Sequence, residues 1–416
     1  MSGTTRSLAM TEAIDRQACA HLLRADGQED LCFALWRPSH GAERLTALVH
    51  ALILPTGDER HVHGNASFEP AYFERAISVA RAADCGLALM HSHPEGAGWQ
   101  GMSKDDVSTE SGRAAAVYAA TGLPFVGLTI AGVDSSWSAR FWERTAPRTY
   151  QRRDCISTRV VGGALHVAFN DRLSPPPAAT DEQVRTISAW GEEKQAIIAR
   201  LRFGVVGAGS VGGFIAEALA RTGAQRIAII DFDTIERKNL DRLCYATRDD
   251  IGEKKAARLA RRLTEIATAA DFQATPIDAA VFEPDGWSAA LDCDILFSCV
   301  DRPWGRQTLN LIAYAHLIPV VDGGVLVKVN RRKALVRADW RAHVAMPGRR
   351  CLECLGQYDP GHVQMERQGQ LDDPSYIQGL DADHILKAGQ NVSAFSMACA
   401  SLQLLQMLAL ERFSSR

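Results

Sequence analysis

The chain has 416 residues, of which 46% are hydrophobic and 23% are charged, and its formal net charge is -3. This length allows two or three domains, and the composition is that of an ordinary globular protein. The near-neutral charge argues against nucleic acid as a partner, and no apolar run reaches the roughly 18 to 20 residues of a membrane span. Residues 1–16 lack the apolar core of a signal peptide, so we expect a cytoplasmic protein with reduced cysteines.

Helices and strands alternate over the first 170 residues or so. The predicted elements are a helix at 11–23, strands at 31–36 and 45–54, a helix at 70–83, a strand at 86–90, a helix that begins after Ser103, and strands at 125–130, 139–143 and 164–169. This order predicts an α/β domain over residues 1–172, with a mixed sheet and flanking helices.

Two histidines follow the strand that ends at Met90. In His91-Ser92-His93-Pro94 the two imidazoles lie on the same face of an extended chain, and Asp106 follows in the first turn of the helix that Ser103 caps. Two histidines and one carboxylate leave a tetrahedral position open, as catalytic zinc sites do. A loop with surface histidines is the commoner origin of an isolated H-x-H, so both interpretations stand at this point.

The pattern H-S-H-P followed by S-x-x-D resembles the JAMM motif of the JAB/MPN family, whose members cleave isopeptide or peptide bonds after ubiquitin-like proteins. The gap between Pro94 and Ser103 is longer than the commonest family spacing. The resemblance implies that His91, His93 and Asp106 bind Zn²⁺ and that Ser103 stabilises the tetrahedral oxyanion. The alternative is a relative whose site has decayed and holds no metal.

The family also uses a glutamate as general base, placed where the first helix runs into the first strand. Glu29 is an acid in that setting, immediately before the strand that begins at Leu31. It would take a proton from the attacking water and pass it to the leaving amine. Glu43, before the next strand, is the main rival, and Asp30 is a weaker one.

A proline-rich segment follows the first domain. Three consecutive prolines, at positions 175–177, cannot join a helix or a central strand, so residues 173–180 are predicted to form a semi-rigid linker. A helix from Thr180 would then lead into a second domain over residues 181–416, which ends in a helix at 392–410.

A glycine loop dominates the second domain. Gly207, Gly209 and Gly212 form a G-x-G-x-x-G spacing between the apolar strand at 203–206 and a helix, and Asp231 ends the next strand about 20 residues further on. The glycines let helix N-terminal amides face a phosphate, and the acid can bind ribose hydroxyls. The loop alone leaves a dinucleotide-binding dehydrogenase and an ATP-using enzyme equally open.

The residues after the loop resemble those of the ThiF/MoeB and ubiquitin-activating enzymes. Residues 231–242 are similar to their D-x-D-x-V-x-x-S-N-L-x-R-Q stretch, residues 251–256 to their G-x-x-K-A element, and residues 298–301 to their S-C-x-D strand end. The resemblance implies a Rossmann-like adenylation domain that uses ATP and Mg²⁺. Lys238, Leu243 and Arg302 depart from the pattern, but the charged residues are retained.

The resemblance also implies residue roles in the attack of a carboxylate on the α-phosphorus of ATP. Asp231 would bind the ribose, Asn239 a phosphate, Arg242 and Lys255 the triphosphate, and Asp301 Mg²⁺. Arg185, from a segment before the first strand, would complete the site of a partner copy, which implies a homodimer through this domain.

Cys351 and Cys354 form the only tight cysteine pair of the sequence. They stand where many relatives carry half of a four-cysteine zinc site, but the chain has no second C-x-x-C, and Cys399 has Ser396 in place of a partner. The pair therefore has three interpretations: zinc ligands completed by Cys399 and another residue, a nucleophile that accepts the activated carboxylate as a thioester, or two ordinary thiols.

Together the two resemblances imply one substrate, the C-terminal tail of a ubiquitin-like or sulfur-carrier protein. The first domain would trim or deconjugate the tail, and the second would adenylate it and pass it to a cysteine or a downstream conjugating protein, as in bacterial ubiquitin-like conjugation systems. The alternatives are carrier activation for a thiocarboxylate pathway and a non-catalytic interaction module.

Overall fold

The computed structural model describes residues 4–63, 65–330, 332, 334–372 and 391–410. The chain divides into two compact units, the first ending at Pro175 and the second beginning at Pro176. The outermost ends of the two expected domains, residues 1–3 and 411–416, lie outside the described part.

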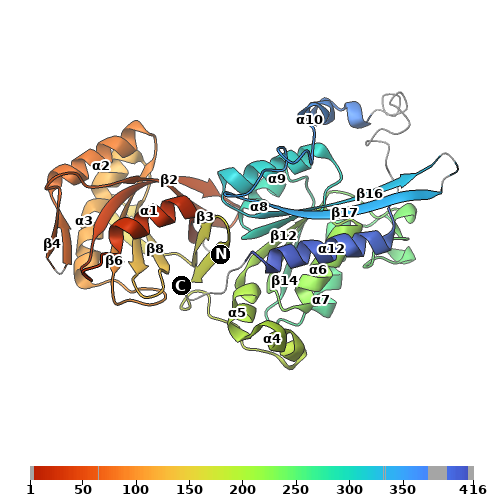
Figure 1. Ribbon diagram of the computed structural model, residues 1–416, viewed down its shortest axis with the longest axis horizontal. Helices are drawn as coiled ribbons and strands as arrows, with labels where there is room; N and C mark the ends of the chain where they lie inside the picture. Colours follow the sequence, from red (N-terminus) through yellow and green to blue (C-terminus); the bar gives the residue numbers. More distant parts are fainter. Residues whose placement is uncertain (1–3, 64, 331, 333, 373–390, 411–416) are drawn as a thin grey trace. The chain divides into compact units, whose positions relative to one another are not determined.

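The first unit is built on a mixed nine-stranded sheet, with the described strands in the order β11-β10-β1-β3-β2-β6-β7-β8-β9 (Figure 1). β1 is parallel to β3 and β10, β6 is parallel to β7, and the other neighbours are antiparallel. The strands are β1 (Thr5–Thr11), β2 (Leu31–His40), β3 (Arg44–Ile53), β6 (Gly86–His93), β7 (Phe125–Ala131), β8 (Trp137–Ala146), β9 (Thr149–Asp154), β10 (Ser157–Val161) and β11 (Leu165–Phe169). β4 (Arg60–His63) and β5 (Asn65–Phe68) form a separate hairpin.

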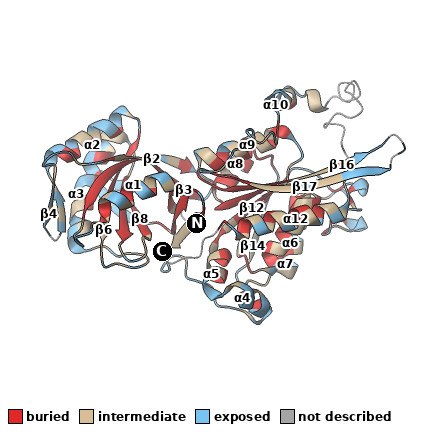
Figure 2. Ribbon diagram, viewed as in Figure 1, coloured by how far each residue is buried: buried red, intermediate tan, exposed pale blue. Residues whose placement is uncertain are grey.

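Helices cover both faces of this sheet. α1 (Glu12–Leu22) packs with the core that contains Trp36 and Phe141, while α2 (Pro70–Ala82) and α3 (Lys104–Thr121) pack with the core that contains Phe33 and Phe125. Figure 2 shows the buried strands between the helices, whose outer faces are exposed. The expected α/β arrangement is therefore present, and it places the end of β6 beside the start of α3.

The second unit has a six-stranded sheet in the order β14-β13-β12-β15-β16-β17. The strands are β12 (Arg202–Val206), β13 (Arg226–Ile230), β14 (Gln273–Ile277), β15 (Ile295–Ser298), β16 (Val320–Val329) and β17 (Leu335–Ala345), and only β17 is antiparallel to its neighbour. One face of the sheet is covered by α6 (Ser210–Arg221), α7 (Lys255–Ile266) and α12 (Ser393–Leu408) (Figure 1). The other face is covered by α8 (Pro284–Leu291) and α9 (Pro303–Ala315), and α10 (Pro360–Arg367) packs on α9. This is the doubly wound arrangement that binds ligands at the carboxyl ends of its strands.

Several elements differ from the sequence-based expectation. The pattern did not predict several strands, most of which are short or lie at a sheet edge: β1, β4, β5, β9, β10, β14 and β17. The helix expected from Thr180 is broken into a 3₁₀ turn (Asp181–Gln183), α4 (Val184–Trp190) and α5 (Glu192–Arg200). Gly191, with φ of +88°, makes the break between α4 and α5.

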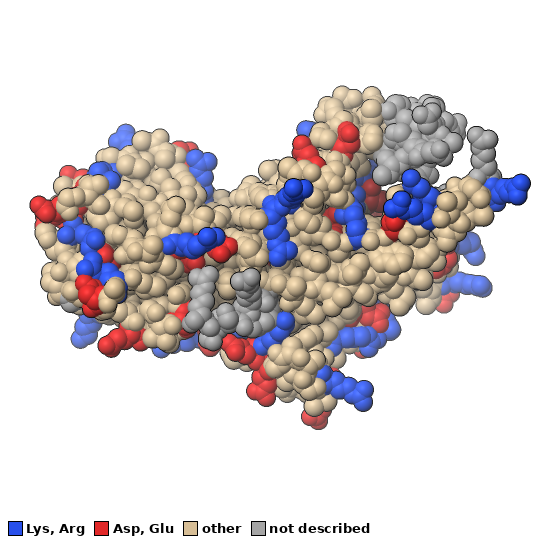
Figure 3. All heavy atoms as spheres, in the orientation of Figure 1, with Lys and Arg blue, Asp and Glu red and all other residues tan. Residues whose placement is uncertain are grey.

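The visible face carries Lys and Arg interspersed with Asp and Glu (Figure 3). Among the described residues, every helix is too short or too polar to cross a membrane.

Candidate functional site

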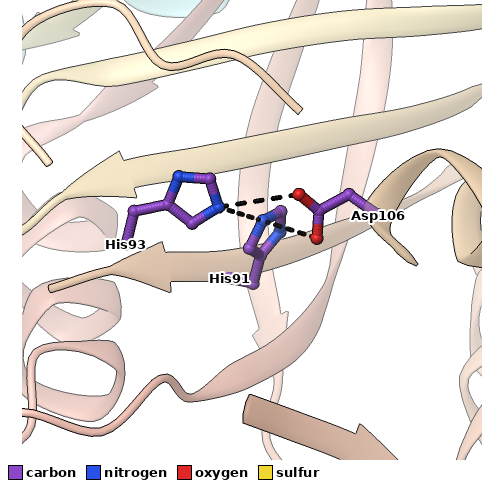
Figure 4. A group of neighbouring side chains, drawn as sticks. All are labelled: His91, His93 and Asp106. Carbon is purple, nitrogen blue, oxygen red and sulfur yellow. Dashed lines mark hydrogen bonds and ion pairs between the residues drawn. The ribbon is translucent and has the colours of Figure 1, made fainter. Parts of the chain in front are cut away.

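β6 and α3 bring His91, His93 and Asp106 together (Figure 4). His91 Nε2 lies 3.2 Å from His93 Nε2 and 3.4 Å from Asp106 Oδ1, and His93 Nε2 lies 3.6 Å from Asp106 Oδ2. The three residues are the one group among the described His, Cys, Asp and Glu whose ligand atoms all lie within 4.8 Å of one another. Asp106, thirteen positions after His93 in the sequence, therefore joins the two histidines in one cluster of donor atoms.

This cluster has the dimensions of a tetrahedral metal site. Ligand atoms that lie about 2.0 to 2.1 Å from a tetrahedral Zn²⁺ are roughly 3.4 Å from one another. The separations of 3.2, 3.4 and 3.6 Å match this edge length. Two imidazole nitrogens and one carboxylate are also a donor set that Zn²⁺ accepts in catalytic sites, so the residues fit the ion.

The N-terminal cap of α3 orients the carboxylate. Ser103 Oγ accepts the Asp106 N–H at 3.0 Å, and the Ser103 N–H donates to Asp106 Oδ2 at 2.8 Å. This reciprocal pair is a capping box, which satisfies two helix-end groups and restricts the carboxylate at the same time. The Ser103 hydroxyl is thus an acceptor in the cap, and it also lies within hydrogen-bonding reach of the Asp106 carboxylate.

The electrostatic setting gives His91 and Asp106 the protonation states that bind a metal, whereas the raised pKa of His93 means that its ring would lose a proton on binding. Burial, reinforced by the positive charge of Arg140, lowers the pKa of His91 to about 3, so its imidazole stays neutral. Burial acts to raise the pKa of Asp106, but hydrogen bonds from His93 and Ser103 outweigh it and hold that pKa below its usual range. The same contact with Asp106 raises the pKa of His93. Neutral imidazole and ionised carboxylate are the forms that bind a cation.

Glu29 lies in the same pocket, a cavity of about 220 Å³ lined by Glu29, His91 and Asp106 among others. It is half-buried, and burial raises the pKa of its carboxyl group. Asp30 is committed elsewhere, because its carboxylate is buried against Arg24 and Arg60. Of the two acids next to this strand, Glu29 is therefore the one that faces the histidines.

Glu43 lies at the other end of the sheet. β2 begins at Leu31, opposite His91, and ends at His40, opposite Leu45. Glu43 immediately precedes β3 at that far end, roughly 30 Å along the strand from the histidines. The structure thus separates the two glutamates that the sequence left as rivals.

A buried polar network behind the histidines was not anticipated from the sequence. Arg140 donates to Glu110 Oε2 at 2.9 Å and to Thr129 Oγ1 at 2.6 Å, and Thr129 Oγ1 lies 3.3 Å from His91 Nε2. Glu110 also accepts the indole N–H of Trp142 at 2.6 Å. The available signal was the spacing of Asp106 and Glu110, four residues apart and hence on one face of the helix.

The second unit folds the glycine loop as a tight turn between β12 and α6. Gly207 has φ of +96°, and a Cβ there would lie 2.6 Å from the Cys299 carbonyl oxygen. A Cβ on Gly212 would lie 1.9 Å from the Gly207 oxygen, whereas Gly209 has open space around it. Gly207 and Gly212 are therefore required by the backbone, and Gly209 leaves room beside the helix N-terminus.

Asp231 supports this loop from the end of β13. Its carboxylate accepts the Ala208 N–H at 2.6 Å and the Asp233 N–H at 2.8 Å, and burial raises its pKa. Asp233 in turn pairs with Lys255, whose Nζ lies 2.7 Å from Asp233 Oδ2. Asp231 and Lys255 thus belong to one connected group at the carboxyl ends of the parallel strands.

Asp301 lies at the same edge. β15 neighbours β12, and the segment after β15 carries Cys299, which contacts Gly207, and then the exposed Asp301. The carboxyl ends of adjacent parallel strands thus bring the glycine loop and the Asp301 segment side by side.

The other predicted adenylation residues are held by local contacts. Asn239 is buried, and its Oδ1 accepts the Glu236 N–H at 3.0 Å. Arg242 donates to the Lys238 carbonyl at 2.8 Å and pairs with Asp241 at 3.0 Å. No described contact joins either side chain to the glycine loop.

Arg185 is remote from the glycine loop within one chain. It is exposed on α4, and the following helix α5 leads into the amino end of β12, opposite the end that carries Gly207. Any role for Arg185 at an adenylation site therefore requires a second copy.

The cysteine pair forms a local turn after β17. The Cys354 N–H lies 3.2 Å from Cys351 Sγ, and hydrogen bonds from the Cys354 thiol and N–H lower the pKa of Cys351. Cys399 is fully buried on α12, where its thiol donates to the Arg341 carbonyl at 3.5 Å. Among the described residues Cys399 is not part of a metal-binding group with Cys351 and Cys354, and its role as their fellow zinc ligand stays a prediction.

The second unit is similar to known proteins. The sequence model of the ThiF family matches residues 180–416. The chain is 37% identical over 146 residues to the tRNA threonylcarbamoyladenosine dehydratase of Escherichia coli, covering 33% of this chain and 52% of the relative. It is 27% identical over 165 residues to the SAMP-activating enzyme E1 of Haloferax volcanii, covering 40% of this chain and 57% of the relative. The chain thus spans about half the length of the curated relatives it matches.

Solved structures were compared as well. The crystal structure of E. coli MccB with AMPCPP and MccA is 16% identical, covers 56% of this chain and 63% of its own, and has a TM-score of 0.42. The family match covers more than half of this chain and contains its glycine loop, Asp231, Lys255 and Asp301. The chain therefore belongs to the ThiF family.

Proposed function

We propose that this chain is a two-site enzyme that hydrolyses a peptide or isopeptide bond at the tail of a ubiquitin-like or sulfur-carrier protein and activates a carrier carboxylate with ATP. The observation that carries the proposal is the cluster of His91, His93 and Asp106 in the unit that precedes the ThiF domain. A hydrolytic site that releases a C-terminal carboxylate and an activating site that consumes one have a natural order in a single chain.

In the first unit, His91, His93 and Asp106 would hold Zn²⁺, which when bound acts as a Lewis acid on the scissile carbonyl and on water. Glu29 would accept a proton from the attacking water and return it to the leaving amine. The Ser103 hydroxyl would donate to the oxyanion that forms as the carbonyl becomes tetrahedral. Arg140 would hold Thr129, whose Oγ1 lies 3.3 Å from His91 Nε2 and so would adjoin the bound ion.

In the second unit, a carboxylate oxygen would attack the α-phosphorus of ATP while the bond to the β-phosphate oxygen breaks and pyrophosphate leaves. The amides after Gly209 would face the phosphates, and Asp231 would bind the ribose. Lys255 would offset charge on the triphosphate, and Asp301 would hold Mg²⁺. Asn239 would donate to a phosphate through Nδ2 and Arg242 through Nη2, because their described contacts engage Asn239 Oδ1 and Arg242 Nη1. Arg185 would act from a partner copy in a homodimer.

Two measurements on the full chain test the proposal. Metal analysis after purification should find about one zinc per chain, and ATP–pyrophosphate exchange should rise when a carrier protein encoded beside the gene is added. Absence of both zinc and nucleotide binding would favour the non-catalytic alternative.

A second candidate follows from one relative, whose printed name is tRNA threonylcarbamoyladenosine dehydratase. In that case the second unit would activate a carboxylate on modified tRNA. Exchange stimulated by tRNA, with no response to the carrier, would replace the carrier hypothesis.

A further inference from the structure

The pocket that contains Glu29, His91 and Asp106 extends along α3 to a second wall formed by Phe68 and Arg113. Phe68 ends β5, the second strand of the small hairpin. The pocket therefore continues beyond the donor cluster and has room for a segment of substrate.

Arg113 is fixed at that wall by aromatic rings. Its guanidinium carbon lies 5.7 Å from the ring centroid of Phe68 and 5.3 Å from that of Phe73. Arginine stacks well on aromatic faces, and such a contact leaves the edge of the planar guanidinium open to acceptors. The cation is thus positioned by packing against rings.

The two acids of the pocket that lie on the same helix as Arg113, Asp106 and Glu110, are engaged by other partners. Glu110 accepts hydrogen bonds from Arg140 and Trp142, and Asp106 is held by the histidines and Ser103. Within the described part of the chain, the Arg113 guanidinium makes no hydrogen bond or ion pair. It is therefore a cation that lines the pocket, with its donors available to a ligand.

The spacing along α3 gives the distance between Arg113 and the donor cluster. Arg113 follows Asp106 by seven residues, which is about two helical turns, so both lie on one face and are separated by roughly 10 Å along the axis. An extended peptide covers this distance in about three residues.

We propose that Arg113 is a specificity-determining residue that binds a carboxylate of the substrate about three residues from the scissile bond. The inference rests on the proposed peptidase function and adds a substrate class to it: tails that are acidic or short. The carboxylate is either the free C-terminus of a short tail or an acidic side chain, since a guanidinium binds both in the same bidentate manner.

The test measures peptide binding to the full-length, zinc-loaded protein with Glu29→Gln, which removes the proposed base. Three fluorescein-labelled peptides share the sequence Ala-Leu-Gly-Gly-Ala-Ala-Ala: one ends in a free carboxylate, one in an amide, and one is an amide with Glu as its last residue. Fluorescence anisotropy should show about tenfold tighter binding of at least one carboxylate peptide than of the neutral amide. Whichever carboxylate peptide binds tighter identifies the source.

Three further variants in the same background locate the effect. Arg113→Gln should abolish the preference while leaving the amide peptide unchanged, which also shows that the fold is intact. Arg113→Lys should retain only part of it, because a lysine lacks the bidentate fork. Arg16→Ala, an exposed arginine on α1, should keep the full preference.

The inference is overturned if all three peptides bind equally, or if the preference survives Arg113→Gln. A second measurement distinguishes failure of this inference from failure of the proposed function: cleavage of the same peptides by the wild-type protein, followed by mass spectrometry. Cleavage without a carboxylate preference defeats the Arg113 assignment alone, whereas a preference that depends on Arg113 without cleavage upholds it and counts against the peptidase.

Discussion

Ser103 and Asp106 cap the same helix reciprocally, so the backbone that begins α3 also aims the carboxylate at His91 and His93. The helix start and the donor cluster are therefore one structural unit. A substitution that removes the cap should lower both the stability of the first unit and its metal affinity.

Replacing Ser103 with Ala should lower the free energy of unfolding of the first unit by about 1 kcal/mol, the usual effect of losing a serine N-cap. Zinc affinity should fall by roughly tenfold or more, because the carboxylate loses its orientation. Urea denaturation and competition with a chelator measure the two effects. Ser108→Ala, an exposed serine on the same helix, is the control and should change neither.

Replacing His93 with Ala should remove zinc from the purified protein and abolish peptide cleavage, because two ligands of the cluster remain where three are needed. ATP–pyrophosphate exchange should continue at the wild-type rate. Metal analysis and the two assays are compared with His40→Ala, an exposed histidine at the far end of β2. If the His93 variant loses ATP–pyrophosphate exchange and the His40 variant keeps it, the two activities are coupled.

Glu29→Gln should lower cleavage by about 100-fold or more while zinc content is unchanged, as expected for a general base that is not a ligand. Glu43→Gln, at the opposite end of β2, should leave cleavage unaffected. A reversal of these two results would show that the base has been assigned to the wrong glutamate.

Asp301→Ala should reduce pyrophosphate exchange by about 100-fold or more, because the triphosphate would lose a magnesium ligand as its charge redistributes. The Asp271→Ala variant changes another exposed acid of the same unit and should retain full exchange. If Asp301→Ala exchanges normally across a magnesium titration, the metal is held by another group.

The two thiols of the cysteine pair should titrate at different pH. The Cys354 N–H and thiol lower the pKa of Cys351, so its reactive thiolate should persist to lower pH than that of Cys354. Alkylation with iodoacetamide, followed by peptide mass spectrometry from pH 6 to 10, measures both midpoints. In Cys354→Ser the backbone N–H still donates, so the Cys351 midpoint should stay below that of Cys244, whose pKa burial raises to about 11. Equal midpoints for Cys351 and Cys354 would contradict this.

The features that could be predicted from the sequence are those that depend on residues close together in the chain. The glycine spacing of 207, 209 and 212, the cap at Ser103 and the alternation of His91 and His93 each depend on neighbours in the sequence, and the structure has the turn, the helix start and the shared face that these patterns imply. The assignment of the second domain likewise agrees with the ThiF family match.

Other features depend on residues that are distant along the chain. Glu29 and Glu43 precede similar strands, and only the antiparallel pairing of β2 with β6 sets Glu29 beside His91. The network of Glu110, Arg140 and Thr129 joins one helix to two strands, and the pairing of Phe68 and Phe73 over Arg113 joins a hairpin and two helices. Thus the sequence by itself determined the identity and local geometry of the donor groups, because caps, glycine turns and strand alternation act over a few residues. Only the tertiary structure decided which acid lies beside the histidines and which cation lines their pocket, because strand register and packing are set by contacts between segments far apart in the chain.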